Sequence, residues 1–223
     1  MPFIALPNID RKVLLGMWKV TETEEYFLSR LSIYENEKAI LDRIAHPQRR
    51  LEWLSSRLCL KELLQIRHKV ESLNAPTGQP YLSDHSFNIS YSHSNRYSGA
   101  IASEHIPVSM DLEDLSKRRS LATRFLFMHP SELEYFDGST DMRAFFLIWS
   151  AKETLFKIHA NRGVIFKENL LINQEHRPLE QSGIVSGLLK THEIEKVYTI
   201  HYSFFPGVLL TYTFDDRLPS EAR

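Results

Sequence analysis

The sequence contains a single cysteine among its 223 residues, so no disulfide can form within the chain. Cys59 lies in the apolar stretch RLCLKELL, where a thiol usually acts as a small buried hydrophobe. A chain without internal disulfides suits a reducing compartment, and we expect a cytoplasmic protein.

The sequence also lacks an excess of charge of either sign and a long apolar run. With 27 lysines and arginines against 28 aspartates and glutamates, its formal net charge is −1, whereas a nucleic-acid-binding domain is usually basic. No apolar run approaches the roughly 20 residues that a membrane-spanning helix needs. The N-terminal stretch MPFIALPNIDRKVLL lacks the basic start and long apolar core of a signal peptide. We therefore expect a soluble protein with no nucleic-acid partner and no membrane partner.

The hydrophobic pattern predicts an α+β fold in which a set of strands and helices occurs twice. The two sets meet near residue 105, which indicates an N-terminal half, 1–105, and a C-terminal half, 106–223. In the first half we expect a strand at 11–20, a helix from Thr21 or Thr23, helices within 36–70 that Pro47 separates, a turn-rich loop at 74–84 and a hairpin at 87–103. In the second half we expect helices at 116–126, 129–136 and 142–160, and strands at 107–115, 163–166, 182–189, 196–205 and 208–214. We expect the hairpin and the strand at 107–115 to be antiparallel neighbours.

Two acidic residues stand close together in the predicted strand PVSMDLEDL (107–115). Apolar residues alternate there with Ser109, Asp111 and Glu113, which is the period of a strand with one buried face. Both carboxylates leave the same side of the strand, roughly 6 to 7 Å apart. Such a pair is most often the solvated face of an edge strand, although like charges so placed repel. A bound cation between the two acids would cancel the repulsion.

The predicted helix at 142–160 has one broad apolar arc and a polar side. Glu153 lies at the boundary of the arc, and Lys157 lies on the polar side. Their spacing of four residues is that of a surface ion pair, worth about 0.3–0.5 kcal/mol. Lys152 falls inside the apolar arc, where a charge is costly unless it is paired or snorkels outward.

Taken together, these residues predict a metal site. Asp111, Glu113 and Glu153 supply three hard carboxylate oxygens and no sulfur, with His93 as the nearest imidazole candidate. This set suits Mg²⁺, which keeps part of its water and shares the phosphates of a substrate.

Three stretches closely resemble, in order and separation, the signature motifs of the 4′-phosphopantetheinyl transferases, in their longer, surfactin-synthetase-associated class. These stretches are ISYSHSNRY (89–97), PVSMDLE (107–113) and WSAKETLFK (149–157). RRLEWLSSR (49–57) and TGQPYL (77–82) resemble two weaker elements of the family. Three motifs in register are far more specific than any one of them.

The resemblance implies two similar α+β halves with antiparallel sheets, related by a pseudo-twofold axis, with the site in the cleft between them. It implies a holo-[acyl-carrier-protein] synthase type of enzyme. Such an enzyme moves 4′-phosphopantetheine from coenzyme A to a serine of an apo acyl or peptidyl carrier protein and releases adenosine 3′,5′-bisphosphate. The implied cofactor is Mg²⁺. Because one chain would supply both halves, we expect a monomer.

The resemblance also implies roles for individual residues. Asp111, Glu113 and Glu153 would hold the metal. Glu153 would take the proton of the carrier serine, directly or through water, and Lys157 would neutralise charge on the pyrophosphate. His93, with Ser92, would contact the phosphates of coenzyme A. Lys152 would be an inward cation that holds the carboxylates in place.

Further residues would bind the 3′-phosphate of coenzyme A. They are Arg57 and one of Arg49 and Arg50, because a guanidinium fork suits a phosphate; the alternative is a solvated helix face. Gln79 stands at the expected phosphate site where many relatives have lysine. Ser109 stands where the family usually has glycine, which adds a side chain where backbone and ligand approach closely.

The carrier protein would be acidic and helical, and the sequence offers a basic cluster for it. Lys117, Arg118 and Arg119, with Phe127 and Met128 from the next helix, would dock the carrier; the alternative is an exposed helix start. Two other functions compete with the transferase. One is a catalytically weakened module that binds coenzyme A or a carrier protein, and the other is a Mg²⁺-dependent phosphodiesterase or nuclease.

Overall fold

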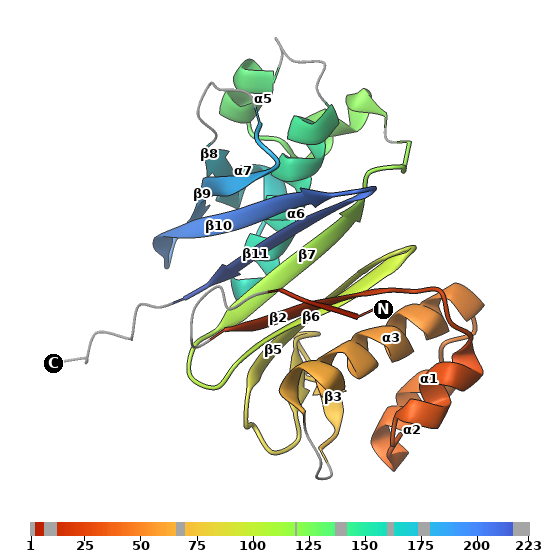
Figure 1. Ribbon diagram of the computed structural model, residues 1–223. Helices are drawn as coiled ribbons and strands as arrows, with labels where there is room; N and C mark the ends of the chain where they lie inside the picture. The colour runs from red at the N-terminus through yellow and green to blue at the C-terminus, as the bar shows by residue number, and fades with distance from the viewer. Residues whose placement is uncertain are drawn as a thin grey trace, which may run out of the picture. The chain divides into compact units, whose positions relative to one another are not determined.

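The structure is a computed structural model that describes residues 3–6, 13–65, 70–118, 120–136, 142–159, 163–173 and 179–215. It has an α+β fold with antiparallel sheets, as predicted (Figure 1). The chain divides into two units, one within Met1–Val108 and the other at Ser109–Asp215. The pseudo-twofold relation and the division at residue 105 stay predictions. No helix of the described residues is long and apolar enough to cross a membrane.

Among its described residues, the first unit combines one four-stranded sheet, three helices and a short hairpin. Its four-stranded sheet has the order β1-β2-β6-β5, with β1 (Phe3–Ala5), β2 (Leu14–Lys19), β5 (Asn88–Ser94) and β6 (Tyr97–Ser103). The helices are α1 (Glu24–Arg30), α2 (Glu35–Asp42) and α3 (Pro47–Leu64). The hairpin pairs β3 (Ser72–Asn74) with β4 (Pro80–Leu82).

Local sequence explains where these helices begin. Thr23 is the residue before α1, and two glutamates in the first turn suit the positive end of the helix dipole. Pro47 opens α3, where its missing N–H costs nothing.

Helix α3 packs against the sheet through a fully buried row that includes Leu54, Leu58 and Cys59. Burial raises the pKa of the Cys59 thiol to about 12, which makes it an inert core residue, as predicted. Gly16 of β2 lies close to side chains of β1 and α3. A Cβ added to Gly16 would lie 2.9 Å from the Phe3 ring and 3.5 Å from the Cys59 sulfur. Glycine there leaves room for the Phe3 ring of the neighbouring strand β1.

The second unit is a five-stranded sheet with helices packed on it. The strand order is β7-β11-β10-β9-β8, with β7 (Val108–Asp114), β8 (Leu170–Asn173), β9 (Ser182–Lys190), β10 (Glu195–Phe205) and β11 (Val208–Phe214). The helical segments are η1 (Leu121–Thr123), α4 (Arg124–Phe127), α5 (Pro130–Phe136), α6 (Met142–His159) and α7 (Phe166–Asn169). The apolar arc of α6 forms the centre of the core, with Phe145, Leu147 and Leu155 fully buried.

Four predictions about elements are wrong. The expected helix at 116–126 is instead a turn followed by two short helical segments, η1 and α4, of which the first begins at Leu121. The strand that carries Asp111 and Glu113 was expected to pair with the hairpin at 87–103. That strand is β7, and it pairs with β11. The hairpin is β5 and β6, and β6 pairs on its other side with β2. The expected loop at 74–84 contains β4 and the last residue of β3. Pro76 and Gly78 lie in the turn between these two strands, and Pro80 is the first residue of β4. The expected strand at 163–166 leads into helix α7, and β8 follows it, because the Asn169 side chain accepts a hydrogen bond from the Ile165 N–H at 2.7 Å and closes a helical turn.

Candidate active site

Strand β7 presents its polar side chains to helix α6. The Ser109 hydroxyl donates to the carbonyl oxygen of Thr154 at 2.8 Å, and the Trp149 indole N–H donates to Glu113 Oε1 at 2.6 Å. Both acidic residues of the strand are buried, with Asp111 5% and Glu113 6% exposed. Asp111 and Glu113 therefore lie on one side of β7, as the alternation predicts, but this side is covered by α6 rather than solvated.

The Asp111 carboxylate is held from both sides by α6. Lys157 Nζ lies 2.7 Å from Oδ1 and also donates to the carbonyl oxygen of Met110 at 3.1 Å. The Ser150 hydroxyl donates to Oδ2 at 2.8 Å. The Lys157 side chain is 27% exposed, so part of it lies open to solvent beside the buried carboxylate.

Behind Ser150, a cluster of buried hydroxyl groups joins α6 to β11. Thr211 Oγ1 lies 2.8 Å from Ser150 Oγ and 2.7 Å from Thr154 Oγ1, and all three residues are fully buried. Sequence reasoning missed Ser150 and Thr211 as site residues. The available signal was that Ser150 and Thr154 share the polar side of α6, which faces the acid strand.

Lys152 has a different partner from the one expected. Its Nζ lies 2.7 Å from Glu132 Oε2, with both side chains almost fully buried, and it donates to the carbonyl oxygens of Phe127 and Phe166. Burial lowers the pKa of Lys152, and the charge of Glu132 opposes this shift. The prediction that Lys152 holds the metal carboxylates is wrong, because its side chain leaves α6 on the side where α5 and α7 pack.

The three carboxylates predicted to bind the metal are not gathered into one ready site. Among the described residues, no group of three or more His, Cys, Asp or Glu side chains is placed to hold a metal ion. The hydrogen bonds described above engage both oxygens of Asp111 and one oxygen of Glu113, and Glu153 is half-buried on α6. Asp111 and Glu113 still fit Mg²⁺, which proteins usually bind through one or two carboxylates with substrate phosphates and water.

In the first unit, the predicted phosphate residue His93 lies on β5 against α3. Its Nδ1 is 3.0 Å from Glu52 Oε2. Burial tends to raise the pKa of Glu52, but the hydrogen bond and charge of His93 bring it below its usual range. The His93 side chain is 43% exposed and so stays accessible to a ligand, while its neighbour Ser92 is buried.

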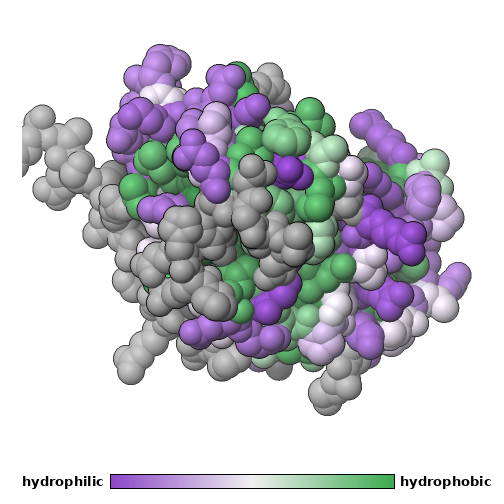
Figure 2. Space-filling model, turned by 90° about the horizontal axis from the view of Figure 1, so that it is seen from above, coloured by the Kyte–Doolittle hydropathy of each residue, from purple (hydrophilic) through white to green (hydrophobic). Residues whose placement is uncertain are grey.

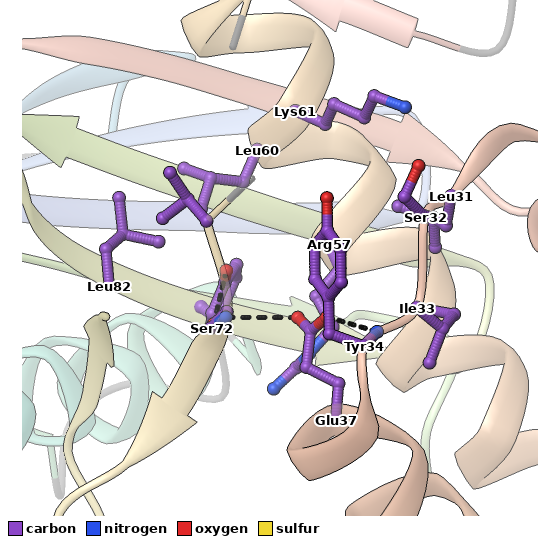
Figure 3. A pocket seen from close by; sticks show the side chains of 12 residues that line it. Leu31, Ser32, Ile33, Tyr34, Glu37, Arg57, Leu60, Lys61, Ser72 and Leu82 are labelled. Carbon is purple, nitrogen blue, oxygen red and sulfur yellow. Dashed lines mark hydrogen bonds between the residues drawn. The ribbon is translucent and has the colours of Figure 1, made fainter. Parts of the chain in front are cut away.

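Arg57 is a buried cation beside a cavity of about 360 Å³ in the first unit (Figure 3). Its guanidinium carbon lies 3.7 Å from the centre of the Trp53 ring and 5.0 Å from that of Tyr91. Only Nη1 donates, to Trp53 O at 3.3 Å and weakly to Ser56, and Nε has no partner among the described residues. Figure 3 also shows Glu37 in the cavity wall, bound to backbone N–H groups at 3.0 and 3.3 Å. A buried guanidinium with unused donors is suited to an incoming anion or to water.

Arg50, by contrast, already has strong partners. Its Nε and Nη2 bind the Glu24 carboxylate at 3.0 and 2.6 Å, and Nη1 donates to the carbonyl oxygen of Leu41 at 2.7 Å. Arg50 therefore joins α1, the end of α2 and α3. The alternative, Arg49, is exposed, and so is Gln79 at the turn between β3 and β4.

Comparison with known families supports the resemblance read from the motifs. Residues 107–203 match the family model described as the 4′-phosphopantetheinyl transferase superfamily. The matched stretch runs from the start of β7 into β10 and includes Asp111, Glu113, Glu153 and Lys157. No curated protein matches the chain significantly. The assignment to the longer, surfactin-synthetase-associated class stays a prediction.

Proposed function

We propose that this protein transfers 4′-phosphopantetheine from coenzyme A to a serine of an apo carrier protein. The observation that carries the proposal is the arrangement of β7 and α6 inside the stretch that matches the superfamily. There Lys157, whose side chain is 27% exposed, binds the buried carboxylate of Asp111 at 2.7 Å, with Glu113 on the same side of the strand. Cationic and acidic groups so combined suit phosphoryl chemistry.

In the proposed reaction, the carrier serine oxygen attacks the β-phosphorus of coenzyme A. A new P–O bond to serine forms, and the bond to the bridging pyrophosphate oxygen breaks, so that adenosine 3′,5′-bisphosphate leaves. Glu153 accepts the serine proton, and Lys157 stabilises the charge on the leaving phosphate. Asp111 and Glu113, with Glu153, would hold Mg²⁺, which when bound supplies further positive charge to the pyrophosphate.

Residues of the first unit would bind the rest of coenzyme A. His93 and Ser92 would contact its phosphates, and Gln79 would lie at the same site. Arg57 has unused donors for the 3′-phosphate. Of the neighbouring pair we now favour Arg49, because the donors of Arg50 are occupied by Glu24 and Leu41.

We also propose a carrier-docking surface, changed from the sequence prediction. Phe127 and Met128 are buried and cannot dock a partner, and Arg119 lies outside the described residues. The two residues before Phe127 are instead exposed, Phe125 to 52% and Leu126 to 78%. Figure 2 shows that apolar side chains reach the surface on the face seen from above. The exposed cations Lys117 and Arg118 come from the same segment and suit an acidic helical carrier.

Replacing Phe125 and Leu126 together by serine should raise the Michaelis constant for the carrier about tenfold, because apolar contacts at a desolvated surface dominate such interfaces. The Michaelis constant for coenzyme A should not change. Ile184→Ser is the matched control, since Ile184 is 60% exposed on β9 of the same unit. Steady-state kinetics with a varied carrier concentration measures both constants, and an unchanged carrier constant would refute the docking surface.

The proposed function is tested by intact-mass spectrometry of an apo acyl carrier protein incubated with this protein, coenzyme A and Mg²⁺. We expect the carrier to gain one phosphopantetheine group, and the gain to disappear with EDTA or with Glu153→Gln. If several carriers gain nothing while coenzyme A still binds, the protein is the binding module. Hydrolysis of coenzyme A without any carrier would instead indicate the phosphodiesterase. A monomeric elution from a sizing column is also expected.

A further inference from the structure

Three buried hydroxyl groups form a continuous chain that ends on Asp111. Ser150 Oγ lies 2.8 Å from Asp111 Oδ2 and 2.8 Å from Thr211 Oγ1, which in turn lies 2.7 Å from Thr154 Oγ1. Ser150, Thr154 and Thr211 are all fully buried, in a unit whose core is otherwise mostly apolar. No role in the proposed reaction uses these hydroxyls.

The hydrogen bonds between these hydroxyl groups and Asp111 can run in only one direction from donor to acceptor. An ionised carboxylate can only accept, and a hydroxyl has one proton, so the Ser150 proton is committed to Asp111. Thr211 must therefore donate toward Ser150, either to its hydroxyl or to its carbonyl oxygen at 3.1 Å. Thr154 must then donate to Thr211. The protons of Ser150 and Thr154 then point along the row of hydroxyls toward Asp111, and the Thr211 proton points toward Ser150.

We propose that Ser150 and Thr211, backed by Thr154, are positioning residues that set the orientation of the Asp111 carboxylate for a divalent cation. With Oδ2 fixed by Ser150, Oδ1 is turned toward the partly exposed Lys157 side chain. The inference rests on the proposed function only in taking Asp111 as a metal ligand. Outer-shell hydrogen bonds of this kind orient metal ligands and tune their affinity.

The position of the chain argues for this role rather than for packing alone. Buried hydroxyls cost free energy to desolvate, and apolar residues of similar shape would fill the same space. A fully satisfied polar network, by contrast, fixes one geometry. Ser109 forms a second hydrogen bond between β7 and α6. Its hydroxyl donates to the carbonyl oxygen of Thr154 at 2.8 Å, in the same turn of α6. Ser109, which stands where the resemblance implies glycine, therefore points its side chain toward α6.

The test is direct titration of the protein with Mn²⁺, with free Mn²⁺ measured by electron paramagnetic resonance, so that no turnover is involved. Ser150→Ala and Thr211→Val should each weaken Mn²⁺ binding about tenfold, the low end of the loss for outer-shell partners. Ser150→Thr keeps the hydroxyl and should restore most of the affinity. Thr213→Val is the matched control: Thr213 is equally buried on β11, but its hydroxyl donates to the Thr199 carbonyl at 2.7 Å, away from Asp111.

Asp111→Asn separates the two ways in which the proposal could fail. If Asp111→Asn loses Mn²⁺ while Ser150→Ala and Thr211→Val bind it like Thr213→Val, the positioning role is refuted and the proposed function stands. If Asp111→Asn binds Mn²⁺ as the wild type does, Asp111 is not a ligand, and the inference is overturned with that assignment. The intact-mass experiment then decides separately whether the protein is a transferase.

Discussion

Replacing Glu132 by glutamine should lower the free energy of unfolding by about 3–5 kcal/mol, because the change leaves a buried ammonium without its counter-charge. Lys152 Nζ lies 2.7 Å from the Glu132 carboxylate, and the two side chains are 0% and 2% exposed. The same carboxylate accepts the backbone N–H groups of His129 at 2.7 Å and Ile172 at 2.6 Å. The pair therefore joins α5, α6 and β8, and glutamine can replace neither its charge nor all of its acceptors.

Urea unfolding followed by circular dichroism measures the effect. Glu134→Gln is the matched control, because Glu134 is exposed on the same helix and its loss should change stability by less than about 0.5 kcal/mol. The double variant Glu132→Gln/Lys152→Met removes both charges and keeps an amide oxygen as an acceptor for one of the two backbone N–H groups, so it should recover part of the lost stability. A single variant Glu132→Gln as stable as the control would show that the pair contributes little.

The Lys152 pair illustrates what a single sequence can and cannot predict. The position of Lys152 inside the apolar arc of α6 follows directly from helical spacing, so the sequence correctly predicts a buried cation that needs a partner. Its partner does not follow, because Glu132 comes from a short separate helix about which helical periodicity says nothing. The nearest acids in the motifs were the natural choice, and they lie on another side of α6.

The acid strand shows the same limit. Alternation predicts that Asp111 and Glu113 share one face of β7, and this holds because a strand has a fixed side-chain period. Strand order has no such local rule, so the pairing of β7 with β11 rather than with the preceding hairpin could not be predicted. The buried hydroxyl of Thr211 was missed for this reason, since it reaches the site only through that pairing.

Replacing Lys157 by methionine should have opposite effects on two measured quantities. The rate of phosphopantetheine transfer should fall about 10²- to 10³-fold, the usual cost of losing one group that stabilises transition-state charge. The affinity for Mg²⁺ should rise severalfold, because the Lys157 ammonium lies 2.7 Å from Asp111 Oδ1 and competes with a dication for that oxygen. If Lys157 served only to stabilise the fold through its ion pair with Asp111, its loss would not combine slower transfer with tighter Mg²⁺ binding.

Transfer kinetics at saturating Mg²⁺ and calorimetric titration of Mg²⁺ measure the two effects on the same preparations. Lys190→Met is the matched control, because Lys190 is 58% exposed and its partner Glu195 lies at the surface. Lys157→Arg keeps the charge, but its planar fork does not reproduce the compact ammonium, so transfer should be only partly restored. A loss of both transfer and Mg²⁺ affinity in Lys157→Met would mean that Lys157 holds Asp111 in place rather than competing for it, and its role would then be one of positioning.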